Sequence, residues 1–252
     1  ALLRSVGTSV ESEMRITPLQ VLARHFWPDG SQLDLSADAR ESEAAIAAWS
    51  GAEEARRFRA FCDTTRELYA TLEGPMIRAQ RPKLGGFTAR LGLQGLSVLA
   101  RMGPMRSLWQ QLGHEFNDPR LRQLFARYAT YCGSSPWEAP ATLMLIAQVE
   151  MDGVWSVEGG MVGMAQALAR VAKRRGAVFK YHSTCQRIEE RQGRVCGVHL
   201  QSGEFLPADR VIFNGDVAAL RQGLLGDGVR RAVPETAPPR SLSALTWSIH
   251  SP

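Results

Sequence analysis

The sequence predicts an α/β protein in which a largely helical first part is followed by a parallel sheet with a β-meander. Apolar residues recur every three or four positions through much of residues 38–80, as on one face of an α-helix. After residue 150 the pattern changes to helix, strand, three short strands joined by tight turns, and a last strand. The 252 residues are 44% hydrophobic and 22% charged, which fits a packed domain and excludes global disorder.

A hairpin and two helices come first. Residues 16–36 read as extended, and Pro28-Asp29-Gly30 is a turn signal between Gln20–Phe26 and Gln32–Leu35. Asp38 or Ser42 can cap the helix that follows. A second helix, which ends at Gly74-Pro75, has a predicted core face of Phe58, Phe61, Cys62, Thr65, Leu68, Tyr69 and Leu72.

Residues 84–113 are rich in glycine and leucine, and Arg90 is the one charge between residues 84 and 100. The segment is too short and too interrupted to span a bilayer. It fits either a buried helix pair or a surface that dips into the membrane interface. Helices are expected again at Met105–Phe116 and at Pro119–Cys132, where Asp118 is the predicted cap and Pro119 the first residue.

Residues 150–226 carry the most informative order of elements. Val154–Val157 is short and extended, and Glu158-Gly159-Gly160 leads into a helix that ends at Gly176. We expect a strand at 177–181, a meander at 184–190, 194–200 and 204–206, and a last strand at 209–214. This order recurs in flavoproteins of the two-dinucleotide-binding type. Their GxGxxG loop is missing, because Gly159-Gly160-x-x-Gly163 does not match it, so either the fold differs or the chain lacks its nucleotide-binding start.

Charge and motif spacing exclude several classes of function. The formal charge is +5, and the basic clusters are short, so they are solvated helix faces or attract an anionic membrane surface. No finger spacing or basic stripe with stacking aromatics is present, so no nucleic-acid partner is expected. The four cysteines form no CxxC pair and the five histidines no HxxxH, so neither a metal site nor a disulfide framework is expected.

Several longer stretches resemble one enzyme family. They are Gly153-Val-Trp-Ser-Val-Glu-Gly-Gly-Met161, Tyr131-Cys-Gly-Ser-Ser-Pro136, Ala208-Asp-Arg-Val-Ile-Phe-Asn-Gly-Asp216 and Phe26-Trp-Pro-Asp-Gly30. The chain resembles the bacterial phytoene-desaturase type of carotenoid desaturase, a branch of the FAD-dependent amine-oxidase-like superfamily. Residues 23–31 and 128–137 are most like the purple-bacterial branch that introduces the C3–C4 double bond of 1-hydroxy- or methoxyneurosporene.

The resemblance implies FAD as cofactor, a C40 carotenoid as substrate, and a peripheral position on the cytoplasmic face of the inner photosynthetic membrane. It implies a substrate and membrane-facing domain at 16–150, part of an FAD-binding domain at 151–226, and a linker at 227–252 that returns to the substrate domain through a strand near Leu242–Ile249. The chain reads as an internal fragment that is expected to be inactive alone. The electron acceptor is not indicated.

Six residues are predicted to contact the cofactor: Gly159, Gly160, Met161, Cys185, Asn214 and Asp216. Two glycines before a helix let a backbone approach a ligand, although a plain tight turn would also need them. Cys185 stands where the family's valine makes backbone bonds to adenine, or is a buried strand cysteine. Asn214 and Asp216 follow a strand at a ligand-binding edge, or form an Asx-type turn.

The predicted substrate-binding residues are Leu93, Leu96, Tyr131, Trp137 and Trp155, which line a hydrophobic tunnel or belong to an ordinary core. Ser134, Ser135 or Arg81 could meet a polar end of the substrate. No catalytic residue is assigned, because a hydrocarbon offers no acidic proton and the hard step belongs to the flavin. Two other functions stay open: a carotenoid isomerase or saturase, and a non-catalytic module that binds lipid or membrane.

Overall fold

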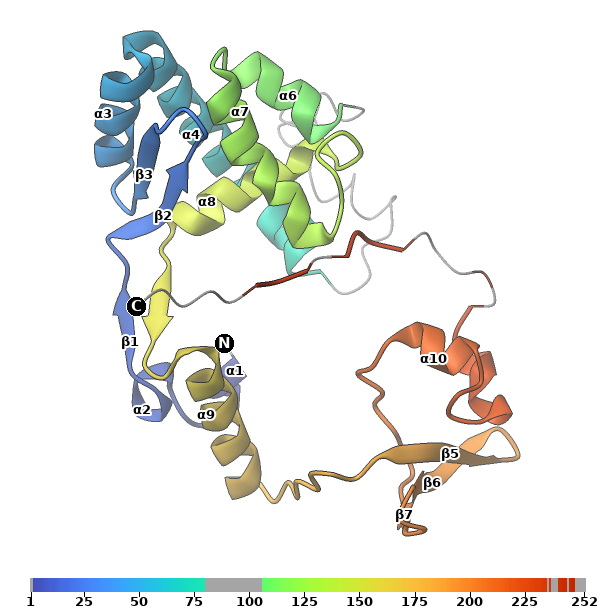
Figure 1. Ribbon diagram of the computed structural model, residues 1–252. Coiled ribbons are helices and arrows are strands. Elements are labelled where there is room, and N and C mark those ends of the chain that lie inside the picture. The colour runs from blue at the N-terminus through green and yellow to red at the C-terminus, as the bar shows by residue number, and fades with distance from the viewer. Residues whose placement is uncertain (1, 80–105, 235, 237–239, 244, 248–252) are drawn as a thin grey trace. The chain divides into compact units, whose positions relative to one another are not determined.

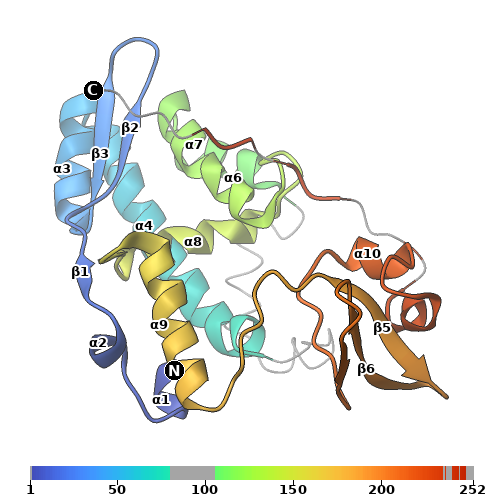
Figure 2. The same cartoon turned by 60° about the horizontal axis from the view of Figure 1, so that its bottom comes forward.

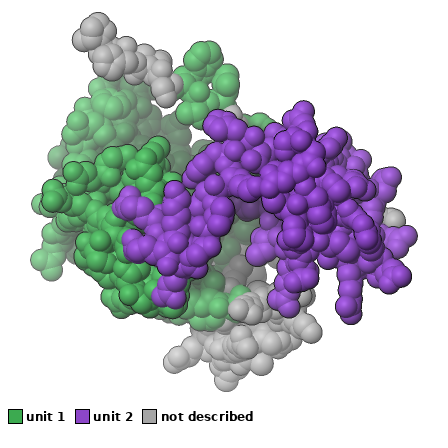
Figure 3. All heavy atoms as spheres, turned by 90° about the horizontal axis from the view of Figure 1, so that it is seen from below, with its two compact units in different colours: residues 1–167, 241–252 green, residues 168–240 purple. Residues whose placement is uncertain are grey.

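The computed structural model describes residues 2–79, 106–234, 236, 240–243 and 245–247 (Figure 1). They form two compact units, residues 1–167 with 241–252 and residues 168–240, which are coloured separately in Figure 3. Most of the predicted glycine- and leucine-rich segment, with Leu93 and Leu96, lies outside the described residues.

The first unit starts with two short helices, α1 (Leu2–Ser5) and α2 (Val10–Glu13), and strand β1 (Ile16–Pro18). Strands β2 (Val21–Phe26) and β3 (Gln32–Ser36) then form the predicted antiparallel hairpin, which lies against helix α3 (Ala39–Ser50) (Figure 2). Leu33 and Leu35 are buried. On the other face, Arg24 donates to both Asp34 carboxylate oxygens at 2.8 Å across the strands. The turn signal at Pro28-Asp29-Gly30 between two extended stretches therefore predicted this element correctly.

Helices α3 (Ala39–Ser50) and α4 (Ala52–Leu72) follow, and a π-helical turn at Glu73–Ile77 ends the pair. Asp38 caps α3 by accepting the Arg40 N–H at 2.8 Å. The predicted stripe of α4 is confirmed, since all its members are buried except Tyr69, which is half-buried.

The rest of this helical body comprises α6 (Leu108–Glu115), α7 (Pro119–Ala126), η2 (Arg127–Cys132), η3 (Ala141–Met144) and α8 (Leu145–Met151). The ring centroids of Phe61, Phe116 and Phe125 lie 4.7–5.1 Å from one another, and these contacts join α4 to α7. Asp118 is the N-cap of α7 and Pro119 its first residue, as predicted. The buried aromatic cluster is the centre of the larger core.

Strand β4 (Trp155–Val157) pairs antiparallel with β1, and helix α9 (Gly160–Arg174) follows. The Glu158 N–H also donates to the Arg15 carbonyl at 3.0 Å. These bonds tie the start of the predicted FAD-binding region to the first unit, and the boundary between the units falls within α9. The functional division at residue 150 stays a prediction.

The second unit contains the predicted meander. Strands β5 (Cys185–Arg191), β6 (Arg194–Leu200) and β7 (Phe205–Pro207) form an antiparallel sheet in the order β5-β6-β7. Gln192 and Gly193 turn between the first two strands with φ values of +51° and +78°. Helix α10 (Val217–Arg221) and the turn η4 (Asp227–Ala232) pack on β5 through a small core of Ile188, Leu220, Leu225 and Val229.

The predicted parallel sheet is not formed by the described residues, in which every strand pair is antiparallel. Among the described residues, the segments 177–181 and 209–214 have no ladder partner, and Ile212 is 96% exposed. A parallel strand needs a neighbour that a crossover brings alongside it, and an apolar pattern does not reveal that neighbour.

The predicted strand near Leu242–Ile249 is likewise absent from the described residues of that stretch, although the Leu242 N–H donates to the Gly133 carbonyl at 2.7 Å. Within the described residues, no helix has the length and apolar character that crossing a bilayer requires.

Candidate functional site

The turn between β4 and α9 has a backbone that only glycine adopts easily. Gly159 has a φ of +78° and Gly160 a φ of +68°, both in the left-handed region. A Cβ on Gly160 would meet nothing within 4 Å, and one on Gly159 would meet only the Gly163 Cα at 3.8 Å. The turn therefore leaves its backbone open to close approach by another molecule.

Gly163 has a different physical role in the same turn. A Cβ at this position would lie well under 3.0 Å from the Glu158 carbonyl oxygen, a separation that real Cβ atoms essentially never show. The first turn of α9 can pack on the Glu158 carbonyl only because residue 163 has no side chain. The sequence Gly159-Gly160-x-x-Gly163 is thus a tight strand-to-helix connection, although it does not match the dinucleotide motif.

The start of α9 favours an anion. The first N–H groups of a 15-residue helix have no partner within the helix, and the helix dipole adds positive potential at that end. No acidic residue lies in the first turn, and Met161 is 70% exposed. Glu158 lies next to the turn and forms an exposed ion pair with Arg15 at 3.4 Å. An open glycine backbone before a helix N-terminus fits the phosphate-bearing part of a flavin nucleotide.

The other predicted cofactor residues lie in the second unit. Cys185 begins β5, and burial raises the pKa of its thiol, so it stays neutral. Asp216 caps α10 by accepting the Ala218 N–H at 2.8 Å, and its other oxygen lies 3.5 Å from Arg240 Nη1. Asn214 is exposed. Because these three residues and the Gly159–Met161 turn lie in separate units, their assembly into one site stays a prediction.

The predicted substrate residues within the described part of the chain are exposed aromatics. Trp137 packs on Trp109 with 5.5 Å between ring centroids, and the Tyr131 hydroxyl donates to Glu150 at 3.3 Å. Neither the cavity beside the hairpin nor the grooves at Arg40 and at Arg221 are lined by Tyr131, Trp137 or Trp155. Leu93 and Leu96 lie outside those residues, so the tunnel stays a prediction.

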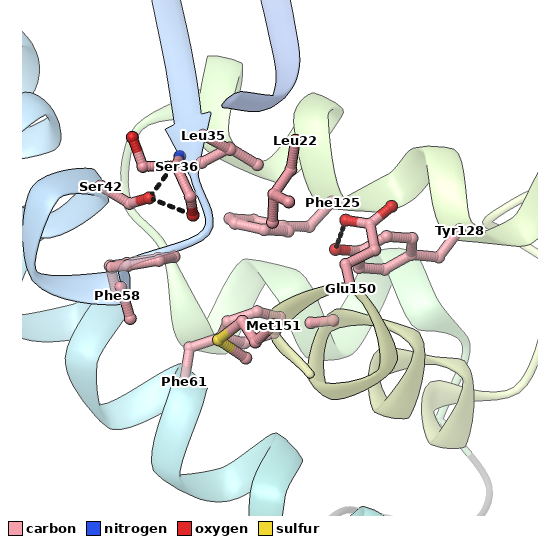
Figure 4. A pocket seen from close by; sticks show the side chains of 12 residues that line it. Leu22, Leu35, Ser36, Ser42, Phe58, Phe61, Phe125, Tyr128, Glu150 and Met151 are labelled. Carbon is pink, nitrogen blue, oxygen red and sulfur yellow. Dashed lines mark hydrogen bonds between the residues drawn. The ribbon is translucent and has the colours of Figure 1, made fainter. Parts of the chain in front are cut away.

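The first unit contains a small apolar cavity between the hairpin, α4, α7 and α8 (Figure 4). Leu22, Phe58, Phe61, Phe125 and Met151 are among the apolar residues of its wall, and its volume is about 20 Å³. A cavity of this size holds about one water molecule. It is far too small for a polyene.

A polar network that sequence analysis missed borders this cavity. Glu150 accepts hydrogen bonds from Arg127 at 2.9 and 2.8 Å and from the Tyr128 hydroxyl at 2.9 Å. Burial raises the pKa of Glu150, but the Arg127 bonds outweigh this effect and the net pKa is lowered. His25 lies nearby, and burial together with the Arg127 charge lowers its pKa. The one sequence signal for this network was a glutamate within the mostly apolar sequence of α8. Its hydrogen bonds link α8 to η2.

Comparison with known proteins shows which family the chain belongs to. The family described as "Flavin containing amine oxidoreductase" matches residues 91–244, which is more than half of the chain. The chain belongs to this family of flavin oxidoreductases.

Three similar proteins are hydroxyneurosporene desaturases. The one from Rubrivivax gelatinosus is 54% identical over 249 residues, which are 98% of this chain and 47% of the relative. The one from Cereibacter sphaeroides is 46% identical over 243 residues (96% and 49%), and the one from Rhodobacter capsulatus is 43% identical over 249 residues (98% and 50%). The predicted resemblance to carotenoid desaturases is confirmed, and the chain spans about half the length of these relatives.

Proposed function

We propose that the protein containing this chain is an FAD-dependent carotenoid desaturase that introduces the C3–C4 double bond of 1-hydroxy- or methoxyneurosporene. The observation that carries the proposal is the 54% identity to a hydroxyneurosporene desaturase across 98% of the chain. The open turn at Gly159 and Gly160 supports it from the structure, because a flavin nucleotide needs a close backbone approach beside a helix N-terminus.

The reaction removes two hydrogens from adjacent carbons that are not acidic. When FAD is bound, its ring accepts the hydride equivalent. The residues of this chain would supply binding and orientation: the open backbone at Gly159 and Gly160 would hold the cofactor, and the exposed Met161 at the start of α9 would contact it. Glu150 is occupied by Arg127 and two tyrosine hydroxyls, so we assign it a structural role rather than that of a base.

Product analysis tests the reaction. The full-length gene is expressed in a host that accumulates 1-hydroxyneurosporene. The carotenoids are separated by chromatography, and mass spectrometry gives the molecular mass of each. A desaturase gives a product with two fewer hydrogens and a red-shifted spectrum, because conjugation is extended. An unchanged mass with altered geometry would indicate an isomerase, a gain of two hydrogens a saturase, and no conversion a non-catalytic module.

The cofactor is tested on the purified full-length protein. Denaturation releases a non-covalent flavin, which chromatography identifies as FAD or another flavin. The proposal requires FAD at close to one equivalent per chain. A colourless protein that regains no flavin on incubation with FAD would contradict it.

We also propose that the protein works at a membrane surface, as a peripheral protein on the cytoplasmic face of the inner membrane. A C40 carotenoid partitions into the bilayer, so an enzyme that takes it up has to meet that surface. Flotation of the full-length protein with vesicles of phosphatidylcholine and phosphatidylglycerol tests this, and failure to float at low salt would count against it.

A further inference from the structure

The positive charge of the chain is concentrated in the second unit. Residues 168–240 contain 13 Lys or Arg against 7 Asp or Glu, a net charge of +6. The rest of the chain contains 17 against 18, a net charge of −1. The formal charge of +5 therefore comes from one unit, which by itself attracts anionic surfaces.

Three arginines of this unit gather at one open groove. Arg221, Arg230 and Arg231 line it together with Asp227 and Val233. The groove lies between the last turn of α10 and the turn η4, which follow one another in the chain. Leu220, Leu225 and Val229 are buried beneath these two elements. The arginines are therefore held on a packed support rather than on a free tail.

The charges at the groove are poorly balanced within the described residues. Arg221 Nε donates to the uncharged carbonyl of Pro234 at 3.0 Å. Arg230 forms an exposed ion pair with Asp227 at 3.3 Å. Arg231 is exposed and has no ion pair within the part of the chain that the structure describes. The groove therefore has three arginines and one carboxylate among its lining residues, and this excess of positive charge favours binding of an anion.

Apolar side chains stand next to these arginines. Leu224, in the loop between α10 and η4, is 65% exposed, and Val217 at the start of α10 is exposed as well. The loop packs on η4, since a Cβ on Gly223 would lie 3.3 Å from Arg230 Cδ. Arginine beside exposed leucine fits a bilayer surface, where phosphates accept bidentate bonds and acyl chains take up apolar groups. No aromatic residue lies between 217 and 234, which disfavours base stacking with a nucleic acid.

We propose that the α10–η4 groove binds the phosphates of anionic lipid headgroups and is a membrane contact of the second unit. The proposal deepens the membrane association proposed above and rests on it. It gives this unit a membrane contact of its own, whether the glycine- and leucine-rich segment is a buried helix pair or a second membrane surface.

Flotation of the full-length holoprotein tests the proposal, with phosphatidylcholine vesicles that contain or lack phosphatidylglycerol. The triple variant Arg221→Gln, Arg230→Gln, Arg231→Gln is compared with the wild type. Each arginine near an anionic surface strengthens binding by about fivefold, so the triple variant should bind anionic vesicles roughly 100-fold more weakly. The matching Arg→Lys triple variant keeps the charge and should retain most of the binding. Leu224→Ser should weaken binding to both kinds of vesicle.

A control variant removes the same charge from the first unit. Arg56→Gln, Arg59→Gln and Arg66→Gln change exposed side chains of α4, and binding should stay within twofold of the wild type. Carotenoid conversion in detergent should be unchanged in the groove variant, which separates membrane contact from the reaction.

Four results would overturn the groove assignment. One is a groove variant that floats like the wild type, in which case membrane association survives and the groove is not its contact. A second is displacement of the vesicles by millimolar inorganic phosphate or pyrophosphate, which would indicate a site for small anions. A third is binding of single-stranded RNA that the triple variant loses. If the wild type floats with neither kind of vesicle, the proposed membrane association fails together with the groove.

Discussion

Gly163→Ala is the sharpest test of the strand-to-helix turn. Alanine is favoured over glycine within a helix by about 1 kcal/mol, so an unhindered change would stabilise α9. At this position the new Cβ would collide with the Glu158 carbonyl oxygen, which is backbone and cannot rotate away. Overpacking of this kind costs about 1–3 kcal/mol, and it is relieved by moving the turn at Gly159 and Gly160. The difference between the two effects is a net destabilisation of up to about 2 kcal/mol, and we expect it together with a loss of bound flavin.

Gly113→Ala is the matched control. Gly113 lies within α6, and a Cβ there would meet Arg122 Nη2 at 3.0 Å, which is the end of a flexible side chain. This variant should be as stable as the wild type or up to about 1 kcal/mol more stable. Urea unfolding of the full-length protein gives the free energies, and absorbance near the flavin band gives the cofactor per chain. If Gly163→Ala behaves like Gly113→Ala in both measurements, the steric argument for the turn is wrong.

Three further predictions concern the first unit. Phe61→Ala should destabilise the protein by about 3–5 kcal/mol, because Phe61 is fully buried and packs on Phe116 and Phe125. Glu150→Gln should cost about 3 kcal/mol, since it leaves the half-buried Arg127 without its charge partner. Asp118→Ala should cost about 1–2 kcal/mol at pH 7, because Asp118 caps α7. Hydrogen bonds from Arg120 lower the Asp118 pKa to about 2, so its contribution is fully present above about pH 4 and is lost as pH falls towards 2.

Chemical unfolding at several pH values measures all three effects. Arg66→Gln serves as a surface control and should change the free energy of unfolding by less than about 0.5 kcal/mol. A Phe61→Ala variant that loses less than 1 kcal/mol would contradict the packed aromatic core. For Asp118, the gap between wild type and variant has to narrow below pH 4, and a constant gap would mean that the carboxylate charge plays no part.

The sequence predicted most of the candidate cofactor turn, but not its surroundings. Gly159 and Gly160 were singled out because two glycines precede a helix, and both have the left-handed backbone that such a turn requires. The predicted aromatic lining was not recovered as a cavity in the described residues. Apolar residue types indicate burial or binding without saying which other side chains they meet.

The network around Glu150 was missed for the same reason. Its bond to Tyr128 joins residues 22 positions apart, and no local pattern marks such a pair. Glu54 is a second case: it is buried and accepts the Asn117 and Asp118 N–H groups at 3.2–3.3 Å from across the core. In the sequence, Glu54 is one of two acidic residues in the first turn of a helix, and such residues are usually exposed, so its burial was not predicted.

The sequence by itself determined the local elements of this protein. The apolar stripe of α4, the cap at Asp118 and the glycine turns of the meander each depend on residues a few positions apart, so periodicity and turn chemistry predict them. Only the tertiary structure decided that β4 pairs with β1, and that segments 177–181 and 209–214 have no ladder among the described residues. Pairing joins backbone groups that are far apart along the chain, and backbone groups are alike in every residue, so side-chain patterns do not identify the partner.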